Sequence, residues 1–330
     1  MQHTRLGRTG LQVSRICLGT MTFGLQVDED ASRAILDHAA SLGVTFLDTA
    51  DAYPLGGDLT TAGRTEEIVG RWLQGRRGDY VVATKCFAPM GRNRWDMGNS
   101  RRHIMDAIDA SLRRLQTDFV DLYQLHFDDP GVPIDETLGA LDDLVRSGKV
   151  RYIGCSNFLA YRLARALGRS ETLGLTRFVS VQPRYNLLFR EFERELFPLC
   201  LEEGIGVIPY NPIAGGMLSG KHDRTKAPDE GTRFMLGNAA QTYQDRYWHD
   251  NVFDTVEQLK KIADEAGIPL PTLAVAWTLR HPAITAPIVG ASRPGQLDAT
   301  IAAVDLQLDP DLVARLDDVT AAYRRGDAPR

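Results

Sequence analysis

The amino-acid sequence predicts an α/β fold, a (β/α)8 barrel of the TIM type. Three observations support this prediction. Eight short apolar segments alternate with eight amphipathic ones along the 330 residues. The short segments are apolar on both faces, as in a parallel sheet that is covered by helices. No Gly-x-Gly-x-x-Gly follows the first of them, which disfavours an open, doubly wound nucleotide-binding sheet. Because eight parallel strands close a barrel, we expect a closed sheet.

The predicted strands are short runs that end in small or polar residues. They span residues 15–21, 44–50, 80–86, 119–127, 150–158, 178–186, 205–212 and 284–292. The predicted helices repeat their apolar residues with a period near 3.6 and several carry start and stop signals. They span residues 28–43, 65–75, 100–116, 134–148, 159–168, 191–204, 252–267 and 293–304.

Three further segments complete the prediction. Residues 5–14, with a turn at Thr9 and Gly10, have the pattern of a hairpin that caps one end of the barrel. Residues 217–250 are polar and weakly periodic, which predicts a long, functional loop after the seventh strand. Residues 308–325 predict an extra C-terminal helix. We therefore expect residues 1–330 to form a single domain.

The composition excludes several classes of protein. The chain is 43% hydrophobic and 25% charged with a formal net charge of −5, which gives no reason to expect nucleic acid or an anionic membrane as a partner. It contains no signal-peptide core and no apolar run of about 20 residues. The histidines show no metal-binding spacing, so no metal site is expected. The four cysteines are scattered, which is typical of reduced thiols in a cytoplasmic protein: Cys17, Cys86, Cys155 and Cys200.

Four titratable side chains follow neighbouring predicted strands. Asp48 ends the second strand in "FLDTADAY", and Tyr53 lies in the loop after it. Lys85 ends the third strand and His126 ends the fourth. Active sites of such barrels lie at the carboxyl ends of the strands, so these groups are expected to meet at one mouth. A tyrosine has an ordinary pKa of about 10, and an ammonium beside it makes it a better proton donor.

Each of these residues also has an ordinary structural explanation. An aspartate after a strand caps a turn, and a lone tyrosine is commonly a packing residue. The lysine can be a solvated residue at the barrel rim, and the histidine a hydrogen-bonded core residue. Their joint occurrence at consecutive strand ends favours catalysis.

Seven motifs in order resemble the aldo-keto reductases over about residues 5–306. They are "FLDTADAY", "VVATK", "DFVDLYQLH", "IGCSNF", "VQPRYN", "VIPYNPIAGGMLSGK" and "APIVGASRPGQL". The resemblance implies an NADP-dependent oxidoreductase that reduces a small-molecule carbonyl. Tyr53 would be the general acid, Lys85 paired with Asp48 would lower its pKa, and His126 would orient the carbonyl.

The resemblance also implies a set of residues for NADPH. Without it, "CSN" reads as a helix cap and Tyr210 as a packing residue. The implied contacts are Gly19, Thr20, Met21, Ser156, Asn157, Gln182, Tyr210, Asn211, Pro212, Ile213, Ala214, Gly215, Lys221, Arg233, Gly290, Ser292, Arg293 and Gln296.

The form of the cofactor follows from "GASRPGQ", where a hydroxyl and a guanidinium precede a predicted helix. Because NADH lacks the 2′-phosphate that Arg293 would bind, we expect NADPH to be preferred. The family often has Glu and Asn at its adenine contacts, whereas this chain has Ala299 and Thr300, which weakens the expectation for adenine binding.

Aromatic residues near the predicted mouth are candidates for the substrate wall, with loop anchoring as the alternative: Phe23, Phe87, Trp95 and Phe127. Two other functions stay open within the family resemblance. One is reduction of a keto-sugar in natural-product biosynthesis, and the other is a cofactor-binding β subunit of a potassium channel. The sequence gives no indication of the oligomeric state.

Overall fold

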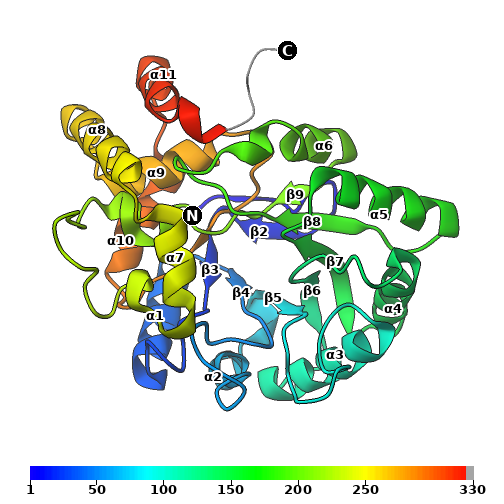
Figure 1. Cartoon of the computed structure of the whole chain (residues 1–330). Helices are drawn as coiled ribbons and strands as arrows, with labels where there is room; N and C mark the ends of the chain where they lie inside the picture. Colours follow the sequence, from blue (N-terminus) through cyan, green and yellow to red (C-terminus); the bar gives the residue numbers. More distant parts are fainter. Residues whose placement is uncertain (325–330) are drawn as a thin grey trace.

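The computed structural model describes residues 1–324 and forms a barrel of eight parallel strands surrounded by helices (Figure 1). The strands follow one another around the sheet in the order β10-β3-β4-β5-β6-β7-β8-β9. Their bounds are β3 Cys17–Gly19, β4 Phe46–Asp48, β5 Val81–Cys86, β6 Val120–Leu125, β7 Val150–Ser156, β8 Phe178–Gln182, β9 Gly206–Val207 and β10 Ile288–Val289. The predicted fold class is confirmed.

The barrel closes between its two shortest strands. Val207 is bridged to Ile284, and Tyr210 is bridged to Ile288, both in the parallel sense. Pro209 accepts a hydrogen bond of 2.8 Å from the backbone of Ile288 at this seam. Because proline has no N–H group to donate, the ladder here is interrupted and β9 and β10 are shorter than the predicted segments.

Helices cover the outside of the sheet. They are α1 Glu29–Ser41, α2 Arg64–Leu73, α3 Arg101–Leu115, α4 Ile134–Arg146, α5 Ala160–Leu173, α6 Leu196–Glu203, α8 Asp250–Ala266 and α10 Gln296–Ile301. The carboxylate of Asp28 caps α1 by accepting a hydrogen bond of 2.9 Å from the backbone of Ala31. The predicted order of strands and helices is thus found along the barrel.

Two helices were not predicted. Helix α9, Leu270–Leu279, is apolar on all sides and almost wholly buried, so it has no amphipathic period to detect. Helix α7, Ala240–Tyr247, lies inside the segment that we expected to be a loop. It buries only Tyr243 and Tyr247, which is too few apolar positions to show a helical period.

The chain termini also match the prediction. Strands β1, His3–Arg5, and β2, Gln12–Ser14, form an antiparallel hairpin. Gly7 in its turn has φ +56°, and a Cβ there would lie 2.5 Å from the carbonyl oxygen of Gly204, so the hairpin approaches the barrel closely. Helix α11, Pro310–Val319, follows α10, whereas Arg325, the last residue of the predicted C-terminal helix, lies outside the described residues.

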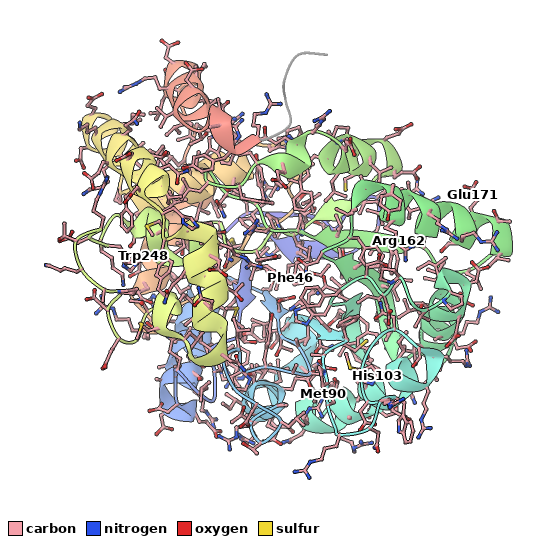
Figure 2. The ribbon with its side chains drawn as sticks, viewed as in Figure 1. Phe46, Met90, His103, Arg162, Glu171 and Trp248 are labelled. Carbon is pink, nitrogen blue, oxygen red and sulfur yellow. The ribbon has the colours of Figure 1, made fainter. Side chains whose placement is uncertain are left out.

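The barrel interior is filled at one end by apolar side chains. Figure 2 shows side chains filling the space inside the ring of strands, with Phe46 labelled near its centre. This inner cluster consists of Leu6, Val13, Cys17, Phe46, Ala83, Leu122, Ile208 and Ala286. Successive side chains on a strand point to opposite faces, so Asp48, Lys85 and Gln124, two residues beyond members of this cluster, also point inward. A polar layer therefore lies above an apolar plug.

None of the helices within residues 1–324 combines the length and the apolar character needed to cross a membrane.

Candidate active site

A buried ion pair lies at the base of the barrel mouth. Lys85 Nζ donates a hydrogen bond of 2.5 Å to Asp48 Oδ1, and the exposed fractions of the two side chains are 0% and 3%. The second carboxylate oxygen, Oδ2, accepts hydrogen bonds from the amides of Gln124 at 3.1 Å and Gln182 at 2.9 Å. Four strands of the barrel wall hold this network in place: the adjacent β4, β5 and β6, and β8, which lies beyond β7.

Tyr53 reaches the same lysine from the loop after β4. Lys85 Nζ donates a hydrogen bond of 3.3 Å to the phenolic oxygen of Tyr53 and one of 2.8 Å to the carbonyl of Thr49. The loop is held at both ends: the backbone of Asp51 donates to the carbonyl of Lys85 at 3.0 Å, and Gly63 donates to the carbonyl of Tyr53 at 3.0 Å. The three predicted residues Asp48, Tyr53 and Lys85 are therefore in one hydrogen-bonded chain.

The pKa of Tyr53 differs from the expectation from the sequence, which was that Lys85 would lower it. Burial raises the pKa of Tyr53 above its ordinary value, although the ammonium of Lys85 acts in the opposite direction. For Lys85, burial lowers the pKa, but the carboxylate of Asp48 and the phenol of Tyr53 outweigh it and the pKa is raised. At neutral pH the lysine is charged and the phenol keeps its proton, which is the state that a proton donor needs.

His126 lies against Tyr53 at the mouth. The ring centroids are 5.8 Å apart in an edge-to-face arrangement. Burial, followed by the charge of Lys85, lowers the pKa of His126 well below its ordinary value. The imidazole is therefore neutral at physiological pH, and its Nδ1 is buried without a hydrogen-bond partner within residues 1–324. A neutral imidazole can donate a hydrogen bond to an oxygen without giving up its proton.

Hydroxyl and amide groups surround the other side of the mouth. Asn157 donates to the carbonyl of His126 at 2.9 Å and to the hydroxyl of Ser156 at 3.0 Å. The phenol of Tyr210 donates to Asn157 Oδ1 at 2.9 Å, and Ser156 donates to the carbonyl of Gln182 at 2.8 Å. The predicted residues Ser156, Asn157, Gln182 and Tyr210 thus form one network around His126.

The segment after β9 packs against α7 and against Arg233, whose Cβ would lie 3.8 Å from a Cβ on Gly215. Asn211 and Ala214 have left-handed backbone conformations, with φ of 58° and 51°. A Cβ on Gly215 would lie 2.6 Å from the ring of Tyr243, so this segment packs directly on α7. Pro212 is buried beside them, and Ile213 is half-buried.

The guanidinium of Arg233 crosses to the loops after β3 and β10. Its Nη1 lies 3.3 Å from the sulfur of Met21. A Cβ on Gly290 would lie 3.3 Å from its Nη2, and a Cβ on Gly19 would lie 2.6 Å from the side chain of Ile288. Thr20, next to these glycines, is buried and donates to the carbonyl of Asp48 at 2.9 Å. Glycine at these two positions therefore lets the side chains of Ile288 and Arg233 pack directly against the backbone at this part of the mouth.

Other predicted residues lie apart from this network. Lys221 is exposed, and its charge acts on His222, whose pKa is lowered to about 4, chiefly by burial. Ser292, Arg293 and Gln296 are exposed after β10, where Gln296 Oε1 accepts a hydrogen bond of 2.8 Å from the backbone of Ser292. The glutamine side chain therefore orders the loop that carries Arg293.

The four aromatic candidates separate into three environments. Phe127 stacks on His126 with ring centroids 5.1 Å apart and contacts Phe87 at 5.4 Å, so both rings border the mouth. Trp95 is 48% exposed and packs under the guanidinium of Arg102. Phe23 differs from the prediction: it is wholly buried in the core between the sheet and the helices, and does not form an exposed wall.

The sequence interpretation missed two residues of the mouth. Gln124 precedes His126 by two residues, so both side chains point into the barrel. The period of two along the strand would therefore have identified Gln124. Tyr243 lies on α7 and raises the pKa of Tyr53 beyond the effects of burial and of Asp48. Its segment lacks a periodic pattern, so no sequence signal marks it.

The sequence of this chain is similar to those of several known proteins. It matches the sequence model of the Aldo/keto reductase family over residues 15–321. It is 40% identical to the uncharacterized oxidoreductase YrpG of Bacillus subtilis, over 97% of this chain and 96% of that protein. It is 37% identical to a probable voltage-gated potassium channel subunit beta of Arabidopsis thaliana, over 97% and 96%. It is 34% identical to versiconal hemiacetal acetate reductase of Aspergillus parasiticus, over 96% of each. The chain therefore belongs to the aldo/keto reductase family of oxidoreductases.

Proposed function

We propose that this protein is a cytoplasmic, single-domain, NADPH-dependent reductase that converts small-molecule aldehydes and ketones to alcohols. The observation that carries the proposal is the hydrogen-bonded chain from Asp48 through Lys85 to Tyr53 at the mouth of the barrel. A structural role alone does not require a charged lysine to contact a half-buried phenol beside a neutral histidine.

Each of these residues, together with His126, has a defined role in the proposed reaction. A reduced nicotinamide would supply the hydride that forms the new C–H bond at the carbonyl carbon. The phenol of Tyr53 donates its proton to the carbonyl oxygen, and its own O–H bond breaks as the phenolate forms. Lys85 stabilises that phenolate by its charge across the 3.3 Å hydrogen bond, and Asp48 keeps the lysine charged and fixed in position. The neutral His126 orients the carbonyl oxygen by donating a hydrogen bond to it.

The residues around the mouth fit such a cofactor. Asn157, Ser156 and Gln182 would hold the carboxamide, and Tyr210 would stack on the nicotinamide ring. Asn211 Nδ2 is buried without a partner within residues 1–324, which leaves a donor available for a phosphate oxygen. Arg233 would neutralise charge near Gly290, and Arg293 with Ser292 would select the 2′-phosphate of NADPH.

Turnover tests the proposal directly. The purified protein is incubated with NADPH and 4-nitrobenzaldehyde, and loss of the nicotinamide absorbance band is followed while the alcohol is quantified by chromatography. Stoichiometric loss of NADPH and formation of 4-nitrobenzyl alcohol supports the proposal. The same assay is repeated with a panel of aldehydes, quinones, steroid-like ketones and keto-sugars. If none of these carbonyl compounds is reduced, the proposal is wrong.

A second candidate function follows from one relative. The similarity to a probable channel subunit beta of Arabidopsis thaliana favours a cofactor-binding regulatory module as the alternative. The two functions differ in turnover: a module would bind NADPH tightly and show no multiple turnover with any of these carbonyls. The keto-sugar alternative is tested by the same panel.

A further inference from the structure

A buried carboxylate lies behind the strand that carries Lys85. Glu66 belongs to the first turn of α2, and its side chain is 0% exposed. Its Oε1 accepts a hydrogen bond of 2.5 Å from the hydroxyl of Thr84, which is also wholly buried. Successive side chains on a strand point to opposite faces, so Thr84 faces the helices while Lys85 faces the barrel interior. Glu66 therefore attaches α2 to the residue that precedes Lys85 on β5.

The other carboxylate oxygen of Glu66 binds an arginine of α3. Glu66 Oε2 accepts a hydrogen bond of 2.7 Å from Arg114 Nε, and the exposed fraction of the arginine side chain is 18%. Arg114 also donates to the hydroxyl of Ser111 at 3.3 Å. Both carboxylate oxygens thus have partners, as a buried charge requires. Glu66 therefore connects three elements, β5, α2 and α3.

The same arginine covers the glycine that precedes α2. Gly63 has φ +90°, and a Cβ there would lie 2.6 Å from Cδ of Arg114, so the arginine side chain packs directly on the backbone. The N–H of Gly63 donates a hydrogen bond of 3.0 Å to the carbonyl of Tyr53. Through Arg114 and Gly63, Glu66 limits where the backbone of Tyr53 can lie.

Two routes therefore join Tyr53 to Lys85. The direct one is the 3.3 Å hydrogen bond between the ammonium and the phenol in the mouth. The indirect one lies behind the barrel wall and runs from Thr84 through the ion pair of Glu66 to Gly63. The distance between phenol and ammonium decides how strongly the ammonium stabilises a phenolate. A displacement of about 1 Å in such a geometry can lower a rate by about 100-fold.

We propose that Glu66 is a positioning residue, which sets the distance between the phenol of Tyr53 and the ammonium of Lys85 without touching substrate or cofactor. The proposal rests on the proposed reductase function and adds to it a residue that lies outside the mouth. The carboxylate takes no part in the proton transfer itself. When it is replaced, α2 and the loop before it shift on the sheet, and the phenol moves away from the ammonium.

Rates of the chemical step test this role. In Glu66→Gln the side chain keeps its shape but loses its charge, so its contact with Arg114 is weakened. We expect the single-turnover rate of 4-nitrobenzaldehyde reduction to fall about tenfold. The KM for the aldehyde and the dissociation constant of NADPH should stay within about twofold. An unchanged rate in Glu66→Gln would overturn the proposal.

A milder variant keeps the proposal testable if Glu66→Gln does not fold. Thr84→Val has nearly the same shape as the wild type, keeps the ion pair of Glu66 and removes only the hydroxyl that attaches the carboxylate to β5. Its single-turnover rate should fall at least about threefold, with the same unchanged binding constants. A wild-type rate in Thr84→Val would contradict the indirect route.

A double variant separates positioning from a general loss of structure. If Glu66 acts through Tyr53, its replacement costs nothing more once the phenol is absent. The rate of Tyr53→Phe/Glu66→Gln should therefore equal that of Tyr53→Phe within about twofold. A further tenfold loss in the double variant would show that Glu66 acts independently of the proton donor, and would overturn the proposal.

Asp142 provides the matched control. It is a buried carboxylate of α4 that likewise binds one threonine, Thr176 at 2.7 Å, and one arginine, Arg146 at 2.5 Å. Within residues 1–324 its hydrogen bonds go to no residue of the mouth. Asp142→Asn should keep the wild-type rate within about twofold. A loss equal to that of Glu66→Gln would count against the proposal, because any buried carboxylate would then have the same effect.

Fluorine NMR tests the position of Tyr53 without turnover. The protein is labelled with 3-fluorotyrosine, and the resonance of Tyr53 is the one that Tyr53→Phe removes. Glu66→Gln should shift this resonance, and Asp142→Asn should leave it unchanged. A shift in a protein that reduces no carbonyl supports the positioning role and refutes the reductase function. An unchanged resonance in Glu66→Gln refutes the positioning role even if the protein reduces aldehydes.

Discussion

Lys85 Nζ lies 2.5 Å from Asp48 Oδ1 in the wall of the barrel, and both side chains are buried. Removing one member of such a pair leaves the other charged and without a counterion. We therefore expect Lys85→Met to lower the free energy of unfolding by about 3–5 kcal/mol. The measurement is urea denaturation followed by fluorescence.

The double variant Lys85→Met/Asp48→Leu provides the control for this pair. An apolar pair of similar volume leaves no unpaired charge, so the double variant should be more stable than the sum of the single effects predicts. Single effects that add to within about 0.5 kcal/mol would show that the two residues do not interact.

Asp51 provides a test of stability against pH. It is wholly buried, both carboxylate oxygens lack hydrogen-bond partners within residues 1–324, and burial followed by the charge of Glu66 raises its pKa well above the ordinary value. The folded state therefore holds a proton that the unfolded state releases above about pH 4. As the pH rises above about 4, the contribution of Asp51 to the free energy of unfolding should fall by about 1.4 kcal/mol per pH unit, until the pH reaches the pKa of Asp51 in the folded protein.

Asp51→Asn removes this dependence, because the amide has the same shape and does not titrate. We expect the variant to be more stable than the wild type at pH 7, and the difference to be smaller at pH 5. Thermal unfolding at both pH values measures it. Asp79→Asn, at an exposed position, is the matched control. A difference that does not change with pH would mean that Asp51 is ionised in the folded protein.

The pH profile of the chemical step follows from the neutral histidine and the protonated tyrosine. Because the pKa of His126 lies well below 6.5 and that of Tyr53 lies above 10, neither group changes protonation between about pH 7 and 9. Single-turnover rates should be constant over this range. The contradicting result is a change in the single-turnover rate with an apparent pKa between about 7 and 9. If that change persists in His126→Asn and is absent in Tyr53→Phe, the phenol titrates at a lower pH than we expect.

Arg293 tests the preference for the phosphorylated cofactor. It is exposed after β10 in a loop that the Ser292–Gln296 hydrogen bond orders. We expect Arg293→Ala to raise the dissociation constant of NADPH about tenfold, through loss of a charge-assisted contact to the 2′-phosphate, and to leave that of NADH within about twofold. Fluorescence titration measures both constants. Equal changes for the two cofactors would contradict a phosphate contact.

The sequence predicts those parts of the fold that have a periodic pattern or a motif. The alternation of strands with helices identifies the barrel. It also places Asp48, Lys85 and His126 at the ends of consecutive strands, where the structure has them. Helix α9 escapes prediction because it is buried on all sides, and α7 because too few of its residues are buried. The mouth residue Tyr243 was missed for a related reason. Its position beside Tyr53 depends on which loops fold over the barrel, which local patterns do not encode.

The most direct measurement is the single-turnover rate of carbonyl reduction in Tyr53→Phe, with NADPH affinity measured on the same preparation. The substitution removes only the phenolic hydroxyl, which accepts the hydrogen bond from Lys85. The proposed mechanism predicts a loss of rate of at least about 100-fold, the effect of removing a general acid, with NADPH affinity changed by less than about twofold. A rate within about threefold of the wild type would contradict the assignment of Tyr53 as the proton donor.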